Sequence, residues 1–149
     1  MCRCSVRQIE NYRQKISGPL LDRIDIHVEV PLVDFRELTS DAVTGESSAV
    51  IRERVAAARQ VQVKRFKSAK LTTNAAMGAK QVRESCKLDA KCRGYIEHAM
   101  EQMNFSARAH DRILKVARTL ADLAGSPDIR ANDVLEAIQF RSLDRKLFD

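Results

Sequence analysis

The clearest alternation of apolar and polar side chains runs from residue 24 to residue 30. Isoleucine or valine occupies the even positions, and Asp25, His27 and Glu29 lie between them. A period of two predicts a strand with one buried face. Pro31 ends the pattern, since proline has no backbone N–H to donate.

A charged pair, Asp22 and Arg23, separates this strand from a turn predicted at Gly18-Pro19. An arginine at the boundary of an element can project from the fold, and its guanidinium can then stabilise negative charge held elsewhere. Arg23 is therefore the first candidate functional residue.

Over most of the remaining chain, apolar residues recur every three or four positions, which predicts amphipathic helices. Ser106 fits the N-cap of one helix, and Gly125-Ser126-Pro127 ends it. The last three helices, joined by short loops, predict a compact bundle. The pattern places helices at residues 5–16, 46 to about 70, 79–86, 88–103 and 107–124, and a last helix from Asn132-Asp133.

A loop of turn-forming residues at 32–45 divides the chain, and we take it as the domain boundary. Residues 1–40 then form one part and residues 46–149 form a helical domain. The expected fold class is mainly α, with a helical bundle preceded by a short helix and one strand.

The chain of 149 residues is 44% hydrophobic and carries a net charge of +6. A basic chain allows a polyanionic partner such as nucleic acid, although ordinary solvated proteins share this balance. The sequence contains no run of about 18 apolar residues, so it predicts no membrane span. The first residues show no apolar signal-peptide region. We expect a cytoplasmic protein with no membrane partner.

The helix predicted from residue 46 carries many cations outside its apolar stripe. Two interpretations stay open, a solvated helix face or a surface that contacts phosphates of nucleic acid. The second interpretation assigns nucleic-acid contact to Arg52, Arg59, Lys64 and Arg65.

The cysteines give no complete metal site. Cys2 and Cys4 form a C-x-C pair, which is half of the four ligands that zinc usually takes. They are either reduced thiols or part of a site whose other ligands lie upstream. Cys86 and Cys92 fall in helical patterns and are most simply small core or surface residues, so we predict no metal ligand.

Arg108 is the second candidate functional residue. It lies in the first turn of the helix after Ser106, where the helix dipole disfavours a cation by about 0.3–1 kcal/mol. An external anion would favour both the arginine and the helix N-terminus. The alternative is a solvated side chain or an ion pair with Asp111.

Several catalytic motifs are absent from the sequence. There is no G-x-x-x-x-G-K-[ST] phosphate loop and no apolar strand that ends in paired acids. No G-x-S-x-G or H-E-x-x-H occurs. Whether the chain serves an enzyme therefore stays open, and in an enzyme it would supply auxiliary parts.

Three runs carry a family resemblance: Cys-Arg-Cys-Ser at 2–5 followed by Ile9 to Tyr12, Lys-Ile-Ser-Gly-Pro-Leu-Leu-Asp-Arg-Ile-Asp-Ile-His-Val-Glu-Val-Pro at 15–31, and Ser-Ala-Arg-Ala-His-Asp-Arg-Ile-Leu-Lys-Val-Ala-Arg-Thr-Leu-Ala-Asp-Leu-Ala-Gly at 106–125. They resemble the magnesium-chelatase-like AAA+ ATPases of the ComM/YifB type. The resemblance covers the whole chain but only the C-terminal third or less of a family member. The family's Lon-protease-like domain and its Walker A and Walker B strands have no counterpart here.

The resemblance implies roles for both candidate arginines. Arg23 matches the arginine finger, which reaches the ATP bound by a neighbouring subunit, and Arg108 matches the sensor-2 arginine of the lid. It also implies a homo-hexameric ring, with ATP and Mg²⁺ held by the parent and none by this fragment alone. The competence branch acts as a DNA helicase in branch migration, whereas magnesium chelatase uses the same motor on a porphyrin.

The resemblance also places the strand at 24–30 in a parallel sheet, which is normally covered on both faces. Because its neighbours are missing, we expect residues 1–40 to be loosely held or to pair with another copy, while residues 46 to about 141 fold as the lid. Two functions stay open. The chain is part of an AAA+ DNA motor, or it is a non-enzymatic basic helical module that binds nucleic acid or a partner protein.

Overall fold

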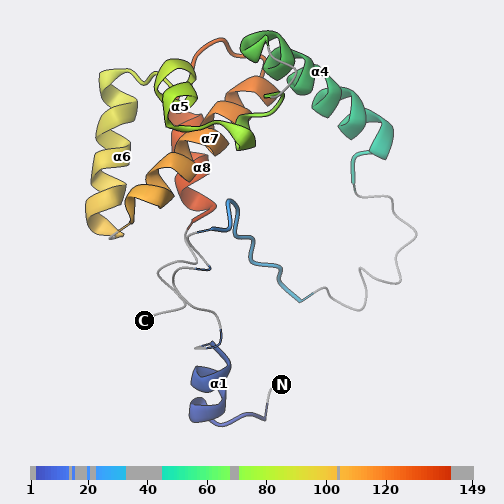
Figure 1. Ribbon diagram of the computed structural model, residues 1–149. Helices are drawn as coiled ribbons and strands as arrows, with labels where there is room; N and C mark the ends of the chain where they lie inside the picture. The colour runs from blue at the N-terminus through green and yellow to red at the C-terminus, as the bar shows by residue number, and fades with distance from the viewer. Residues whose placement is uncertain are drawn as a thin grey trace.

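The computed structural model describes residues 3–13, 15, 20, 23–32, 45–67, 71–103 and 105–141. The mainly helical fold expected from the sequence is confirmed (Figure 1). The elements are α1 (Val6–Arg13), α4 (Ser48–Phe66), the 3-10 helix η1 (Asn74–Ala76), α5 (Ala79–Ser85), α6 (Ala90–Gln102), α7 (Ala107–Leu123) and α8 (Ala131–Gln139).

Helix α7 is the centre of the helical bundle, because it packs against α4, η1, α5 and α8. One face of α7 carries Ala109, Ile113, Ala117 and Ala121, and all four are fully buried. A spacing of four residues keeps these side chains on one side of a helix. The small alanines allow the neighbouring helices to approach closely, since the distance between helix axes depends on the side chains at the contact.

Local hydrogen bonds explain where the helices begin and end. The Ser106 hydroxyl accepts the N–H of Ala109 at 3.2 Å, so the predicted N-cap of α7 is present. Helix α6 starts later than predicted because the Asp89 carboxylate accepts the N–H of Cys92 at 2.7 Å. Helix α4 stops short of residue 70 because Lys67 adopts a left-handed conformation with φ 47°.

The strand predicted at 24–30 is not formed. Within the described ranges, no residue belongs to a strand, and residues 24–30 are irregular. A strand needs a partner for its backbone N–H and C=O groups, and the described chain supplies none. The alternating residues are consequently exposed, from 41% for Ile24 to 81% for Val30.

The described segment 23–32 instead passes the C-terminal end of α8 and then leads away from the bundle (Figure 1). At the end of α8 the N–H of His27 donates to the carbonyl oxygen of Phe140 at 2.8 Å. The boundary loop predicted at 32–45 lies outside the described residues, apart from its two ends. The division between residues 1–40 and 46–149 therefore stays a prediction. No helix in the described ranges is long and apolar enough to cross a bilayer.

Candidate functional site

Arg108 lies in the first turn of α7 and is exposed. Among the described residues, its guanidinium has no ion pair or side-chain hydrogen bond. The partner proposed as an alternative, Asp111, pairs with His110 instead, at 3.2 Å between carboxylate oxygen and Nδ1. The positive charge at this helix N-terminus is thus not neutralised by a nearby carboxylate of the described chain.

Arg23 is also exposed. Its backbone N–H donates to the carbonyl oxygen of Leu20 at 3.0 Å, which makes a turn that presents the side chain. No described residue pairs with the Arg23 guanidinium, and its sequence neighbour Asp22 lies outside the described part.

Three contacts join the segment that follows Arg23 to the helical bundle. Asp25 forms an ion pair with Arg112 of α7. Arg141, directly after α8, donates from Nη1 to the carbonyl oxygen of Ile24 at 2.5 Å. Together with the His27 backbone contact, these interactions connect the Arg23 segment to the end of α8 and, through Arg112, to α7, the helix that carries Arg108.

Sequence reasoning missed Arg112 and Arg141. The spacing of four between Arg108 and Arg112 placed both on one helix face and could have marked the second residue. No local signal identified the partner of Arg112, because Asp25 lies 87 positions away in the sequence. Arg141 follows the last helix, and nothing in its neighbourhood predicted that its side chain would be buried.

The four cations assigned to nucleic acid are divided by the structure. Arg52, Arg59 and Lys64 are exposed on α4, and the described chain gives them no ion pair. Arg65 differs, because its side chain is only 18% exposed and forms a two-pronged ion pair with Asp122 of α7. Arg65 therefore holds α4 on the bundle and does not belong with the three exposed cations of α4.

A buried polar network surrounds this ion pair. The Asp122 carboxylate also accepts from Asn74 Nδ2 at 2.8 Å and from Arg118 Nε at 3.1 Å. Burial alone raises the pKa of Asp122, but hydrogen bonds from Arg65 and Asn74 and the charges of Arg118 and Arg65 outweigh it and lower the pKa. A buried carboxylate with this many donors stays ionised, so the network fixes how α4 and η1 sit on α7.

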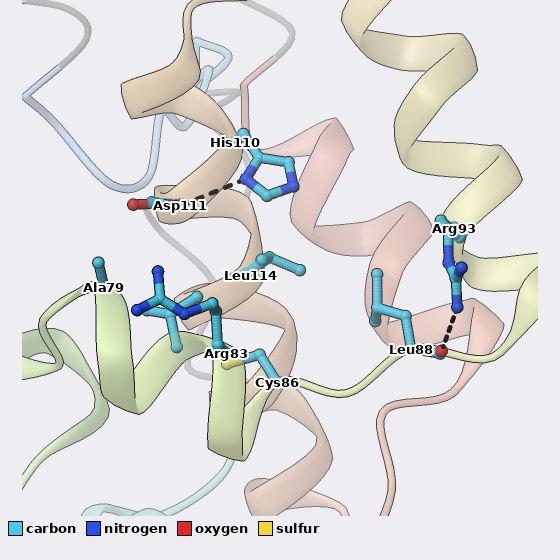
Figure 2. Close-up of a pocket in the computed structure, with 9 residues that line it drawn as sticks. Ala79, Arg83, Cys86, Leu88, Arg93, His110, Asp111 and Leu114 are labelled. Atoms are coloured by element: carbon cyan, nitrogen blue, oxygen red, sulfur yellow. Dashed lines mark hydrogen bonds and ion pairs between the residues drawn. The ribbon is translucent and has the colours of Figure 1, made fainter.

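A pocket of about 390 Å³ lies between α5, the start of α6 and α7 (Figure 2). Its buried lining is apolar, and exposed charged side chains surround it. Burial raises the pKa of the Cys86 thiol to about 11, so this sulfur stays protonated and is not a nucleophile near pH 7. The lining residues are Ala79, Val82, Arg83, Cys86, Leu88, Arg93, His110, Asp111 and Leu114.

Cys86 and Cys92 are core residues. The sequence had left a core or a surface position open for both. Cys92 is fully buried and Cys86 is 6% exposed. Cys4 is exposed, and Cys2 lies outside the described residues. The described ranges hold no group of three or more His, Cys, Asp or Glu side chains that could bind a metal ion.

Two family profiles match the chain. The profile described as magnesium chelatase, subunit ChlI C-terminal, matches residues 45–141, and the profile of magnesium chelatase, subunit ChlI, matches residues 1–38. The chain belongs to the magnesium chelatase family. The resemblance inferred from the three sequence runs is thereby confirmed.

Relatives of this magnesium chelatase-family chain are longer proteins. It is 39% identical to the competence protein ComM of Haemophilus influenzae and 40% identical to the protein YifB of Escherichia coli, over 97% of the chain in each case. YifB of Salmonella typhimurium is 36% identical over the same share. The chain spans about 28% of the length of these curated relatives.

Of the groups in a nucleotide, only the phosphates have suitable partners among the described residues of this family member. Arg108 supplies an unneutralised cation at a helix N-terminus, which suits a phosphate oxygen, and Arg23 supplies a second exposed guanidinium. The described carboxylates are dispersed or already paired with cations, so they do not form the oxygen ligand set that Mg²⁺ takes.

Proposed function

We infer that this chain is the C-terminal portion of a magnesium-chelatase-like AAA+ ATPase that couples ATP hydrolysis to DNA remodelling, in particular branch migration. The observation that carries the proposal is the pair of exposed guanidinium groups, Arg23 and Arg108, which no described carboxylate neutralises. Family membership supports it. One relative is named a competence protein, and DNA as the substrate of the motor is part of this proposal.

In this proposal the chain supplies charge to a nucleotide that other parts of the protein hold. Arg23 acts as a finger toward the γ-phosphate bound by the neighbouring subunit of a hexameric ring. Arg108 contacts the phosphates bound by its own subunit. Mg²⁺, held by residues outside this chain, neutralises charge on the phosphates when it is bound.

Such roles have a clear physical basis. Phosphoryl transfer proceeds mainly through positioning and stabilisation of developing negative charge, and an arginine supplied in trans accelerates it by about 10³–10⁵. A guanidinium is permanently charged and offers several donors to phosphate oxygens. Because Arg23 acts across a subunit boundary, ATP hydrolysis then depends on assembly of the ring.

The test measures steady-state ATP hydrolysis by the full-length protein. We expect Arg23→Ala to lower kcat by at least about 10³, with little change in nucleotide affinity. Arg108→Ala should lower kcat and also weaken nucleotide binding. Arg83→Ala is the matched control, since Arg83 is an exposed arginine on α5 with no role in this proposal. Near-normal hydrolysis in both test variants would remove the assignment.

A second candidate function rests on α4. Its exposed Arg52, Arg59 and Lys64 fit a non-enzymatic module that binds nucleic acid through phosphates. Each phosphate contact lowers log K by about 0.9 per unit of log salt concentration on duplex DNA. The same cations would serve a partner protein with an acidic surface.

Titration of the 149-residue chain with duplex and forked DNA at two salt concentrations separates the candidates. The DNA-binding module predicts salt-dependent binding that is lost when the three cations are replaced with Gln, and retained when Arg83 and Lys87 are replaced instead. If the chain acts only as a lid, it should have little affinity for duplex or forked DNA at either salt concentration.

A further inference from the structure

The segment that follows Arg23 is fixed to the helical bundle at three points. Arg141 donates to the Ile24 carbonyl oxygen at 2.5 Å, Asp25 pairs with Arg112, and the His27 N–H donates to the Phe140 carbonyl oxygen at 2.8 Å. We call these three contacts the clamp. They hold a segment that has no regular structure of its own.

One contact of the clamp is buried and one is partly open to solvent. Arg141 is fully buried, and its guanidinium carbon lies 5.9 Å from the centre of the Phe105 ring. Burial of an unpaired polar group is costly, and the Ile24 carbonyl oxygen accepts from Nη1 of this buried guanidinium, so this contact anchors the segment. The Asp25 and Arg112 side chains are 38% and 31% exposed, and such a pair can break and re-form without unfolding the bundle.

Helix α7, which supplies Arg112 to the clamp, also carries Arg108. Arg108 and Arg112 are four residues apart on α7, so their Cβ atoms lie about 5–6 Å apart on one face. Asp25, the partner of Arg112, is two residues from Arg23. One turn of helix and one ion pair therefore connect the two candidate phosphate-binding arginines.

We propose that Asp25, Arg112 and Arg141 are positioning residues that link Arg23 mechanically to the bundle. Asp25 and Arg112 make the link to α7, and Arg141 makes the link to the end of α8. This inference rests on the proposed function. When Arg108 contacts a phosphate of its own subunit and shifts α7, the clamp moves the Arg23 segment with it. The nucleotide state of one subunit then sets whether Arg23 reaches the nucleotide of the next.

The clamp meets the physical requirement for such coupling. Energy passes between two sites through a contiguous set of contacts whose arrangement both sites bias. The path here has no gap in the described residues: Arg108, α7, Arg112, Asp25 and the turn at Arg23. If the segment were attached only to neighbouring strands of a sheet, a movement of α7 would not reach Arg23 by this route.

The first experiment uses the 149-residue chain with Cys2 and Cys4 replaced by Ser and spin labels at Val28→Cys and Ala124→Cys. Both label sites are exposed, while Cys86 and Cys92 are buried with thiol pKa values of about 11 and stay unlabelled. Double electron–electron resonance should give one narrow distance distribution. Arg112→Gln should broaden it, and Arg112→Gln with Arg141→Gln should broaden it further. Identical narrow distributions in all three proteins would overturn the clamp.

The second experiment uses charge reversal in the full-length protein. Arg112→Asp should lower kcat for ATP hydrolysis by about tenfold, within the range of coupling between contacting residues, and leave KM for ATP within about twofold. Arg112→Asp combined with Asp25→Arg should restore most of the lost kcat, because the ion pair re-forms with reversed polarity. A defect that does not depend on the Asp25–Arg112 ion pair would not be rescued by a second change of charge.

The two proposals fail in different ways. If Arg23→Ala abolishes hydrolysis but Arg112→Asp has no effect on kcat, or if the charge reversal gives no rescue, the positioning role is wrong and the proposed motor stands. If Arg23→Ala and Arg108→Ala both leave hydrolysis normal, the motor assignment falls and the positioning role falls with it.

Discussion

Asp122 lies where three helical elements meet and accepts hydrogen bonds from Arg65, Asn74 and Arg118. Its side chain is fully buried, and the side chain of Arg118 is 4% exposed. Removal of one partner from a buried ion pair is costly because it leaves an uncompensated charge. The residue that orients α4 on the bundle is therefore acidic and internal, not one of the exposed basic residues.

Asp122→Asn tests this network through its dependence on pH. We expect the variant to lose about 3 kcal/mol of unfolding free energy at pH 7. The folded-state pKa of Asp122 lies below its usual value of 3.8, so the unfolded chain takes up the proton first as pH falls. The contribution is full above about pH 5 and is lost as pH falls through 3.8 toward the folded-state value.

Urea denaturation followed by circular dichroism at pH 7, 5, 4 and 3 measures this effect. The difference in unfolding free energy between the unaltered chain and Asp122→Asn should shrink as the pH falls. Asp128→Asn removes an exposed carboxylate and is the matched control. A constant difference across this pH range would show that the charge of Asp122 does not carry the stabilisation.

At the scale of elements, helices α4 and α7 show how far local pattern determines structure. The apolar stripe of α7 is buried along its length. The stripe predicted on α4 is buried only at Ala58 and Gln62, while Ile51 and Val55 are 41% and 43% exposed. Figure 1 shows the reason, since the N-terminal half of α4 extends away from the bundle and no described element covers it.

This difference predicts unequal costs for two matched N-cap changes. Ser106→Ala should lower the free energy of unfolding by about 1 kcal/mol, because α7 is the central helix and its cap is lost only with the whole fold. Ser47→Ala should cost less than about half as much in global stability, because the start of α4 frays locally. Equal losses for both variants in urea denaturation would show that the N-terminal half of α4 is part of the cooperative core.

Much of the helical fold was predictable because its signals are local. Ser106 and the spacing of four on α7 lie within one stretch of sequence. The ion pair of Arg65 was not predictable because its partner, Asp122, lies 57 positions away. A basic residue on a helix has the same local sequence pattern whether it meets solvent or a buried carboxylate. The resemblance assigned roles to Arg23 and Arg108, and these roles stay predictions. The contacts of Arg112 and Arg141 depend on tertiary structure.

At the scale of the whole molecule, residues 24–32 carry the sequence pattern of a buried strand, but the described structure neither forms this strand nor buries its apolar side chains. The apolar side chains that should fill one face of a sheet are exposed, including Leu32 and Val30. An extended, exposed apolar segment can pair with another strand. The segment has the composition of a sheet strand, but the described residues contain no strand with which it could pair.

Hydrogen exchange distinguishes a segment that never forms a strand from one that forms a strand only when neighbouring strands are present. In the 149-residue chain, the amide of His27 should exchange more slowly than those of Val28 and Val30, because it alone of the three donates to Phe140. In the full-length protein, sheet pairing should slow Val28 and Val30 by at least about 100-fold, since ladder amides exchange only on opening. The amides of Ile113 and Ala117 in α7 are the internal control, and they should change little. Unchanged fast exchange at Val28 and Val30 in the full-length protein would mean that the period of two at residues 24–30 does not encode a strand.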